Sequence, residues 1–234
     1  MAPVRGRVCA ICSERVLSSY AIPEPDGLIR CPECRRIDRP FERAAAYGSY
    51  DGGLRELIHL LKYNGVRPAA AVLGRMLAQA IASLRSEFDQ APILVVPVPL
   101  YKGKRLQRGF NQAELIARAA LKQLKDERLQ LGVDLLSRIR DTHSQIGLTS
   151  HQRRENLRGA FAVDRATEVT GRDIILVDDV YTTGTTAMEC ARVLSRAGAR
   201  HVWVATVART LKLASKYAEV DQVVPDEVAA AVGD

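Results

Sequence analysis

Two stretches of the chain place apolar residues at the spacing of an amphipathic helix. The first runs from Asp51 to Asn64–Gly65, and its positions i, i+3, i+4 and i+7 are Leu54, Leu57, Ile58 and Leu61. The second opens at Pro68 and continues to about Glu87, with one face lined by Leu73, Leu77, Ile81 and Leu84. A third helix is predicted over 111–124, because Asn111 followed by Glu114 resembles a capping box.

Continuous apolar runs predict strands that are buried on both faces. The clearest runs are ILVVPVPL at 93–100 and the runs at 173–178 and 202–207, while 133–139 and 159–163 are weaker candidates. A helix over 185–197, which Gly198 ends, connects two of the clear runs into a βαβ unit. Alternating strands and helices predict an α/β fold whose parallel sheet is covered on both faces.

Polar stretches separate these elements. Residues 35–50 form a basic link into the main domain, and 101–109 form a basic loop. The stretch 140–158 is too long for an ordinary connection, which indicates a functional loop. Lys62 and Tyr63, at the end of the first helix, face either a ligand or solvent.

The bulk composition is that of a globular protein, with 234 residues, 47% hydrophobic and 26% charged. No apolar run approaches the roughly 20 residues of a membrane span, and the N-terminus has no secretory core, so we expect a cytoplasmic protein without membrane insertion. The formal net charge of +7 favours anionic partners such as nucleotides, nucleic acid or an acidic protein surface.

Four of the five cysteines form two CxxC pairs separated by 18 residues, at Cys9, Cys12, Cys31 and Cys34. This spacing is typical of a structural four-thiolate zinc site, and two disulfides are the competing interpretation. Cys190 is interpreted as a small buried apolar residue. We expect a four-cysteine zinc ribbon over 1–40, a main domain over 41–210 and a tail over 211–234, in which Val223–Val224 is a candidate strand.

Two adjacent carboxylates, Asp178 and Asp179, follow an apolar strand and precede the turn Thr182-Thr183-Gly184-Thr185-Thr186. Ligands of open α/β sheets bind outside the carboxyl ends of the strands. The turn enters a helix, where backbone N–H groups and the helix dipole favour an anion, and Gly184 permits close approach. No GxxxxGK[ST] sequence occurs, so ATP bound in the Walker A manner is disfavoured.

The two carboxylates would repel further phosphates, but they accept hydrogen bonds from a vicinal diol. The sequence therefore predicts a ribose 5-phosphate site, with the phosphate on the threonines and the diol on the aspartates. The competing interpretation is an acidic turn that only caps the following helix.

The stretch IILVDDVYTTGTTA (174–187) resembles the phosphoribosyl pyrophosphate (PRPP) signature of type I phosphoribosyltransferases, although Tyr181 stands where an aliphatic residue is usual. VPVPLYKGKRLQRGFNQAELIA (96–117), THSQIGLTSHQRRENLRGAF (142–161) and the paired CxxC motifs are together similar to the ComF (competence protein F) family. The resemblance implies a type I phosphoribosyltransferase-like fold: a Rossmann-like parallel sheet with flanking helices and a flexible hood loop, preceded by the zinc ribbon.

The resemblance also implies roles for matching residues. Asp178 and Asp179 would be catalytic and hold the ribose hydroxyls, within a PRPP-binding set of Asp178, Asp179, Val180, Tyr181, Thr182, Thr183, Gly184, Thr185 and Thr186. The loop after the strand at 93–98, near Pro99 to Lys102, would face pyrophosphate, and 142–158 would form the hood that closes over PRPP. The residues implied for these two loops are Pro99, Leu100, Tyr101, Lys102, Lys104, Arg105, Arg108, Gln145, Arg153, Arg154 and Asn156.

Three functions remain open. The first is transfer of phosphoribose from PRPP, with Mg²⁺, to an unidentified acceptor; no side chain is an obvious nucleophile or general base, which suits this chemistry. The second is a sensor that binds PRPP or a nucleotide without turnover. The third, implied by the family's link to natural transformation, is a factor that handles single-stranded DNA or contacts a protein of the competence machinery. Few aromatics accompany the basic loops, so a stacking platform is not evident.

Overall fold

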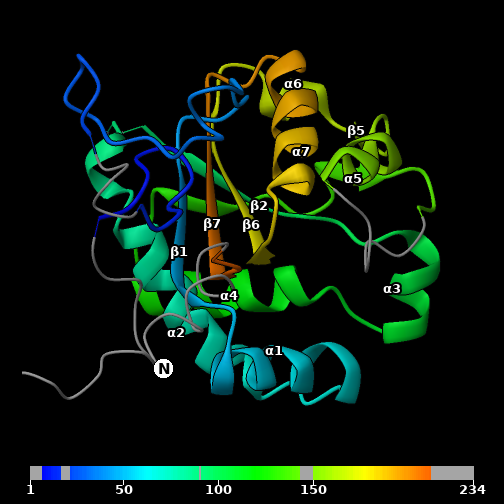
Figure 1. Ribbon diagram of the computed structural model, residues 1–234. Coiled ribbons are helices and arrows are strands. Elements are labelled where there is room, and N and C mark those ends of the chain that lie inside the picture. Colours follow the sequence, from blue (N-terminus) through cyan, green and yellow to red (C-terminus); the bar gives the residue numbers. More distant parts are fainter. Residues whose placement is uncertain (1–6, 17–21, 90, 143–149, 212–234) are drawn as a thin grey trace, which may run out of the picture.

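A five-stranded parallel sheet forms the centre of the molecule, in the order β1-β7-β6-β2-β3 (Figure 1). The computed structural model describes residues 7–16, 22–89, 91–142 and 150–211. The strands are β1 Ala44–Ser49, β2 Ile93–Pro97, β3 Leu129–Leu131, β6 Asp173–Tyr181 and β7 His201–Arg209. The predicted parallel sheet is confirmed.

Helices cover both faces of this sheet, as predicted. Successive strand residues point to opposite sides, so a strand that is apolar throughout has two apolar faces to bury. On β6, Ile175 and Val177 pack in one core with the helices α1 Gly52–Asn64, α2 Ala69–Ala82 and α4 Gln112–Leu124. Ile174 and Leu176 pack in the other core, with α7 Thr185–Arg196. Cys9, Cys12 and Cys31 belong to this second core, and Cys34 packs against it. These four residues, called the cysteine unit below, therefore lie on the α7 side.

A second, antiparallel sheet of β4 Leu136–Arg138 and β5 Phe161–Val163 joins the α7 side. Along the chain, α5 Ser150–Leu157 comes between β4 and β5, and α6 Ala166–Val169 connects β5 to β6. The predicted strands at 133–139 and 159–163 therefore exist but are shorter. None of the helices within the described ranges is long and apolar enough to cross a membrane.

Several element ends agree with the sequence signals. Gly65 ends α1 in the left-handed conformation (φ 66°), and the Asn111 side chain accepts a hydrogen bond from the N–H of Ala113 at 3.0 Å, so it caps α4. The strand predicted over 93–100 ends at Pro97. Val98 donates one last bond to the carbonyl of Val177 at 2.8 Å, and Pro99 then has no N–H to donate.

Other elements correct the sequence interpretation. The presumed link at 35–50 contains β1, whose sequence AAAYGS has little intrinsic strand preference; pairing with β7 stabilises it. The short strand β3 was not predicted either. The basic loop at 101–109 contains α3 Lys102–Arg108, which buries none of its residues and therefore shows no apolar periodicity. The predicted second helix stops at Ala82, and a 3₁₀ turn (Arg85–Glu87) follows. The predicted strand at Val223–Val224 lies outside the described residues.

Candidate functional site

The acidic pair lies at the carboxyl edge of the sheet because β6 extends further than its neighbour β2. The last β2–β6 pair joins Pro97 to Val177, whereas β6 continues beside β7 to the pair of Tyr181 with Arg209. Beyond Val177 the strand therefore has a neighbour on one side only. This open edge is where ligands of parallel α/β sheets bind.

The two carboxylates face different surroundings. Asp178 is partly exposed and lines a small hollow together with residues of β6, β7 and α7, among them Thr182, Gly184, Thr185, Thr186 and Thr206. Asp179 is buried, with 3% of its surface exposed, and its Oδ2 lies 2.6 Å from the Nζ of Lys62 at the end of α1. The structure thus brings Asp178 to the threonine turn and pairs Asp179 with a lysine from the opposite face.

Burial raises the pKa of the Asp178 carboxyl to about 8, the neighbouring Asp179 carboxylate adds to the rise, and Lys62 opposes it. Burial also disfavours the ammonium of Lys62, but the charges of Asp179 and Asp178 outweigh this, so the pKa of Lys62 is raised. The site therefore lacks enough positive charge beside Asp178 to favour its ionised carboxylate.

The threonine turn forms the uncapped start of α7. Gly184 adopts the left-handed conformation (φ 77°), and no side chain caps the helix there. The hydroxyl oxygens of Thr183 and Thr185 lie 2.8 Å apart in one hydrogen bond. Because the first N–H groups of a helix have no partner within it, this end offers donors to an anion.

The segment predicted to face pyrophosphate continues directly from β2. Val98 lines the same hollow as Asp178, whereas Pro99, Leu100, Lys102 and Arg105 line a separate hollow that includes Glu114 and Asp134. Tyr101 forms an isolated parallel bridge with Arg138.

The other basic residues predicted to face pyrophosphate, Lys104, Arg105 and Arg108, differ in their surroundings. Arg105 lies 3.5 Å from a carboxylate oxygen of Asp134 and 3.9 Å from one of Glu114, and Lys104 is exposed. Arg108 donates to the Gln112 side chain, and its guanidinium carbon lies 5.8 Å from the ring centroid of Tyr63. Their role toward pyrophosphate stays a prediction.

The predicted hood contains the helix α5. Gln145 and the side chain of Arg153 lie outside the described part of the chain, while Arg154 is exposed and Asn156 is half-buried. Arg140 donates to the carbonyls of Asn156 (3.0 Å) and Arg158 (2.6 Å), so it ties the entry of this segment to its exit.

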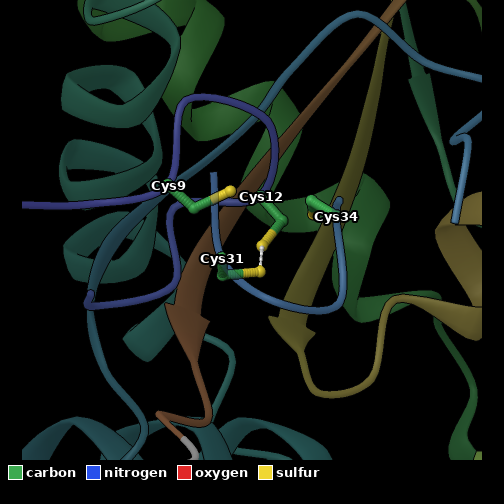
Figure 2. A group of neighbouring side chains, drawn as sticks. All are labelled: Cys9, Cys12, Cys31 and Cys34. Carbon is green, nitrogen blue, oxygen red and sulfur yellow. Dashed lines mark hydrogen bonds between the residues drawn. The ribbon is translucent and has the colours of Figure 1, made fainter. Parts of the chain in front are cut away.

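The four sulfurs of the cysteine unit converge from two loops, as Figure 2 shows, and all lie within 4.8 Å of one another. None of the cysteines forms a disulfide, and the Sγ atoms of Cys12 and Cys31 are 3.7 Å apart. In a tetrahedron with zinc–sulfur bonds of about 2.3 Å the sulfurs are about 3.8 Å apart. The donor set fits a closed structural Zn²⁺ site without an open position. Cys190 is fully buried, as interpreted.

Sequence reasoning missed three basic residues around these sites. The sequence does not decide whether Lys62 faces a ligand or solvent, and its place in the last turn of α1 is the local signal of its position. Arg39 and Arg209 are almost fully buried and contact both the cysteine unit and Tyr181. No local motif distinguishes either arginine from a surface arginine.

No family model matches the chain. DNA utilization protein YhgH of Escherichia coli O157:H7 is 32% identical over 211 residues, which cover 87% of this chain and 91% of that protein. Competence protein F of Haemophilus influenzae is 30% identical over 181 residues, covering 76% of this chain and 78% of the relative. A solved hypoxanthine phosphoribosyltransferase from Staphylococcus aureus is 14% identical, with a TM-score of 0.36 over 63% of this chain and 70% of that chain.

The ion pair between Lys62 and Asp179 predicts strong coupling in a double-mutant cycle. Lys62→Met leaves a buried carboxylate unpaired and should lower the free energy of unfolding by about 3 kcal/mol. Adding Asp179→Asn should recover more than about 1 kcal/mol of this loss in urea denaturation at pH 7. The exposed pair Arg118–Glu114 serves as control, with coupling below about 0.5 kcal/mol. Equal coupling in both cycles would contradict this assignment.

Because the pKa of Asp178 is raised, Asp178→Asn should increase the free energy of unfolding by an amount that depends on pH. The folded chain keeps this carboxyl protonated to about pH 8, the unfolded chain only to about pH 4. Ionisation therefore removes stability as the pH rises between these values. Relative to the unsubstituted protein, Asp178→Asn should be more stable by about 1–3 kcal/mol at pH 9, with little difference at pH 4. Urea denaturation at both pH values measures this, and a pH-independent difference would speak against it.

Proposed function

The chain belongs to the ComF family, and from this premise we propose that it is a cytoplasmic protein that binds PRPP, or another phosphorylated ribose, with Mg²⁺ and transfers phosphoribose to an acceptor. The observation that carries the proposal is a single hollow lined by Asp178 and by residues of the threonine turn at the uncapped start of α7. This hollow combines an acceptor for sugar hydroxyls with donors for a phosphate.

The 5-phosphate binds the N–H groups and hydroxyls at Thr182–Thr186, since a helix N-terminus favours an anion. The ribose diol binds at the acidic pair through Asp178, the member that lines the hollow, because a carboxylate accepts strong hydrogen bonds from neighbouring hydroxyls. Lys62 holds Asp179 in place, so Asp178 is the more exposed contact. Mg²⁺ bound with PRPP would supply positive charge that neutralises pyrophosphate, and such charge near Asp178 would favour its ionised form.

The reaction breaks the bond between C1 of the ribose and pyrophosphate and forms a bond from C1 to the acceptor, with pyrophosphate as the leaving group. Positive charge develops on the ring during this step, and a nearby carboxylate stabilises it. Positioning and electrostatics thus do the work, in a site where the described side chains offer no nucleophile aligned with a base. The hood predicted over 142–158, of which residues 143–149 lie outside the described part of the chain, would exclude water from the bound sugar.

Titration calorimetry tests the binding. PRPP with Mg²⁺ should bind the unsubstituted protein, and Asp178→Asn together with Asp179→Asn should abolish the heat signal. Asp89→Asn, at an exposed carboxylate that lines neither this hollow nor the one predicted to face pyrophosphate, should bind PRPP unchanged. A screen of amines and bases for pyrophosphate release then separates a transferase from a sensor that only binds. PRPP affinity that survives the double substitution would refute the assignment of the site.

A second candidate function is contact with single-stranded DNA, in line with relatives named for DNA utilization and competence. One observation favours it: Tyr63, 66% exposed, lies beside Arg108, and Arg67 lies over the Phe110 ring at 5.3 Å. An exposed ring beside a cationic side chain offers a stacking surface for a base. The fold creates this arrangement by bringing the end of α1 to α3.

Tyr63→Ala should weaken binding of an oligothymidine by about tenfold, because stacking of one base is worth about 1–3 kcal/mol. Fluorescence anisotropy at several salt concentrations measures the affinity, which should fall steeply with salt. Tyr47→Ala, at a half-buried tyrosine on β1, is the control and should leave the affinity unchanged. Equal effects of both substitutions would exclude Tyr63 as a stacking platform.

A further inference from the structure

Tyr181, the last residue of β6, contacts two buried guanidinium groups, those of Arg39 and Arg209. The Nη1 of Arg39 donates a hydrogen bond to the Tyr181 hydroxyl at 3.0 Å, and the guanidinium carbon of Arg209 lies 4.5 Å from the centre of the ring. Tyr181 is 3% exposed, and burial raises the pKa of its hydroxyl, which keeps the side chain neutral. The position of Tyr181 therefore depends on both arginines.

The same two arginines contact the cysteine unit. The Nε of Arg39 donates to the sulfur of Cys34 at 3.0 Å, and the Nη2 of Arg209 donates to the sulfur of Cys12 at 3.5 Å. Their side chains are only 2% and 3% exposed. These contacts link residues from three distant parts of the sequence.

The hydrogen bonds that Arg39 and Arg209 donate to cysteine sulfur favour anionic sulfur. Glu14 compensates Arg209 with one contact at 2.7 Å, and Glu33 lies 3.7 Å from Arg39. Neutral thiols accept hydrogen bonds weakly, whereas four thiolates around one Zn²⁺ carry a net charge of about −2. The Nε and Nη1 of Arg209 have no hydrogen-bond partner among the described residues, so its contacts to sulfur and Glu14 matter most. The thiolate form of the cluster is thus the state that holds both arginines.

On its other side Tyr181 contacts the threonine turn. A Cβ atom added at Gly184 would overlap the hydroxyl and ring of Tyr181, so the turn lies directly against this side chain. A displacement of Tyr181 would leave the start of α7 without this support. The chain of contacts runs from cysteine sulfur through an arginine to Tyr181 and then to Gly184.

We propose that the metal-loaded cysteine cluster positions the phosphate-binding turn through Arg39, Arg209 and Tyr181, so that perturbing the cluster weakens phosphate binding at the turn. The inference rests on the proposed function only for the identity of the ligand. Tyr181 is a positioning residue here and touches no reacting atom.

Ribose 5-phosphate binding tests the coupling in the zinc-loaded protein. Tyr181→Phe removes the hydroxyl and Arg39→Met removes the hydrogen bonds to Tyr181 and Cys34, and each should weaken ribose 5-phosphate about tenfold while the zinc content stays at that of the unsubstituted protein. Arg200→Ala, which breaks an ion pair with Asp173 at the other end of β6, should change neither quantity. Should Arg39→Met fail to fold, Tyr181→Phe decides alone.

A second readout does not depend on ligand binding. Replacing Zn²⁺ by the larger Cd²⁺ moves the sulfurs outward, and the amide signal of Gly184 in NMR spectra should shift in the unsubstituted protein but much less in Tyr181→Phe. A Gly184 signal that ignores the metal would overturn the coupling, whether or not ribose 5-phosphate binds. If the signal responds but ribose 5-phosphate does not bind, the coupling holds and the proposed function fails.

Discussion

The structure depends on the full burial of β6 up to Val177 and on its release from β2 beyond that residue. The buried half anchors the strand between two cores and fixes its direction. The free half then carries Asp178 and Asp179 at an edge where only β7 still pairs with it. Two neighbouring carboxyl groups are tolerated there because Asp179 pairs with Lys62, while the raised pKa of Asp178 keeps that carboxyl neutral up to about pH 8. The unfavourable electrostatics of the pair is thus confined to the open edge of the sheet.

Much of this arrangement follows from local patterns in the sequence. The apolar run at 173–178 and the glycine within the threonine turn determine a strand, a tight turn and a helix start, and all three are physical properties of neighbouring residues. The CxxC spacing likewise brings four sulfurs together by loop geometry. The parallel order of the sheet follows from the alternation of strands and helices.

The elements and side-chain roles that could not be predicted from the sequence depend on contacts between distant segments. β1 has few strand-forming side chains and exists because β7 offers an edge, and α3 buries nothing that a periodicity could reveal. Lys62, Arg39 and Arg209 resemble ordinary surface cations until the fold buries them beside anionic groups. A charged residue carries no local signal of its partner, so its role appears only in three dimensions.

Lys62, Arg39 and Arg209 have the same physical role at two places, the acidic pair and the cysteine unit. Each lies beside a carboxylate that burial would otherwise make costly: Asp179 for Lys62, Glu33 for Arg39 and Glu14 for Arg209. The two arginines also donate to cysteine sulfur. Tyr181 lies between the arginines and the threonine turn, where the related signature usually has an aliphatic residue. A ring is long enough to reach Arg39 and Gly184 at once, whereas an aliphatic side chain offers no hydroxyl to Arg39. The tyrosine at this position therefore contacts both the arginines beside the cysteine unit and the threonine turn in this chain.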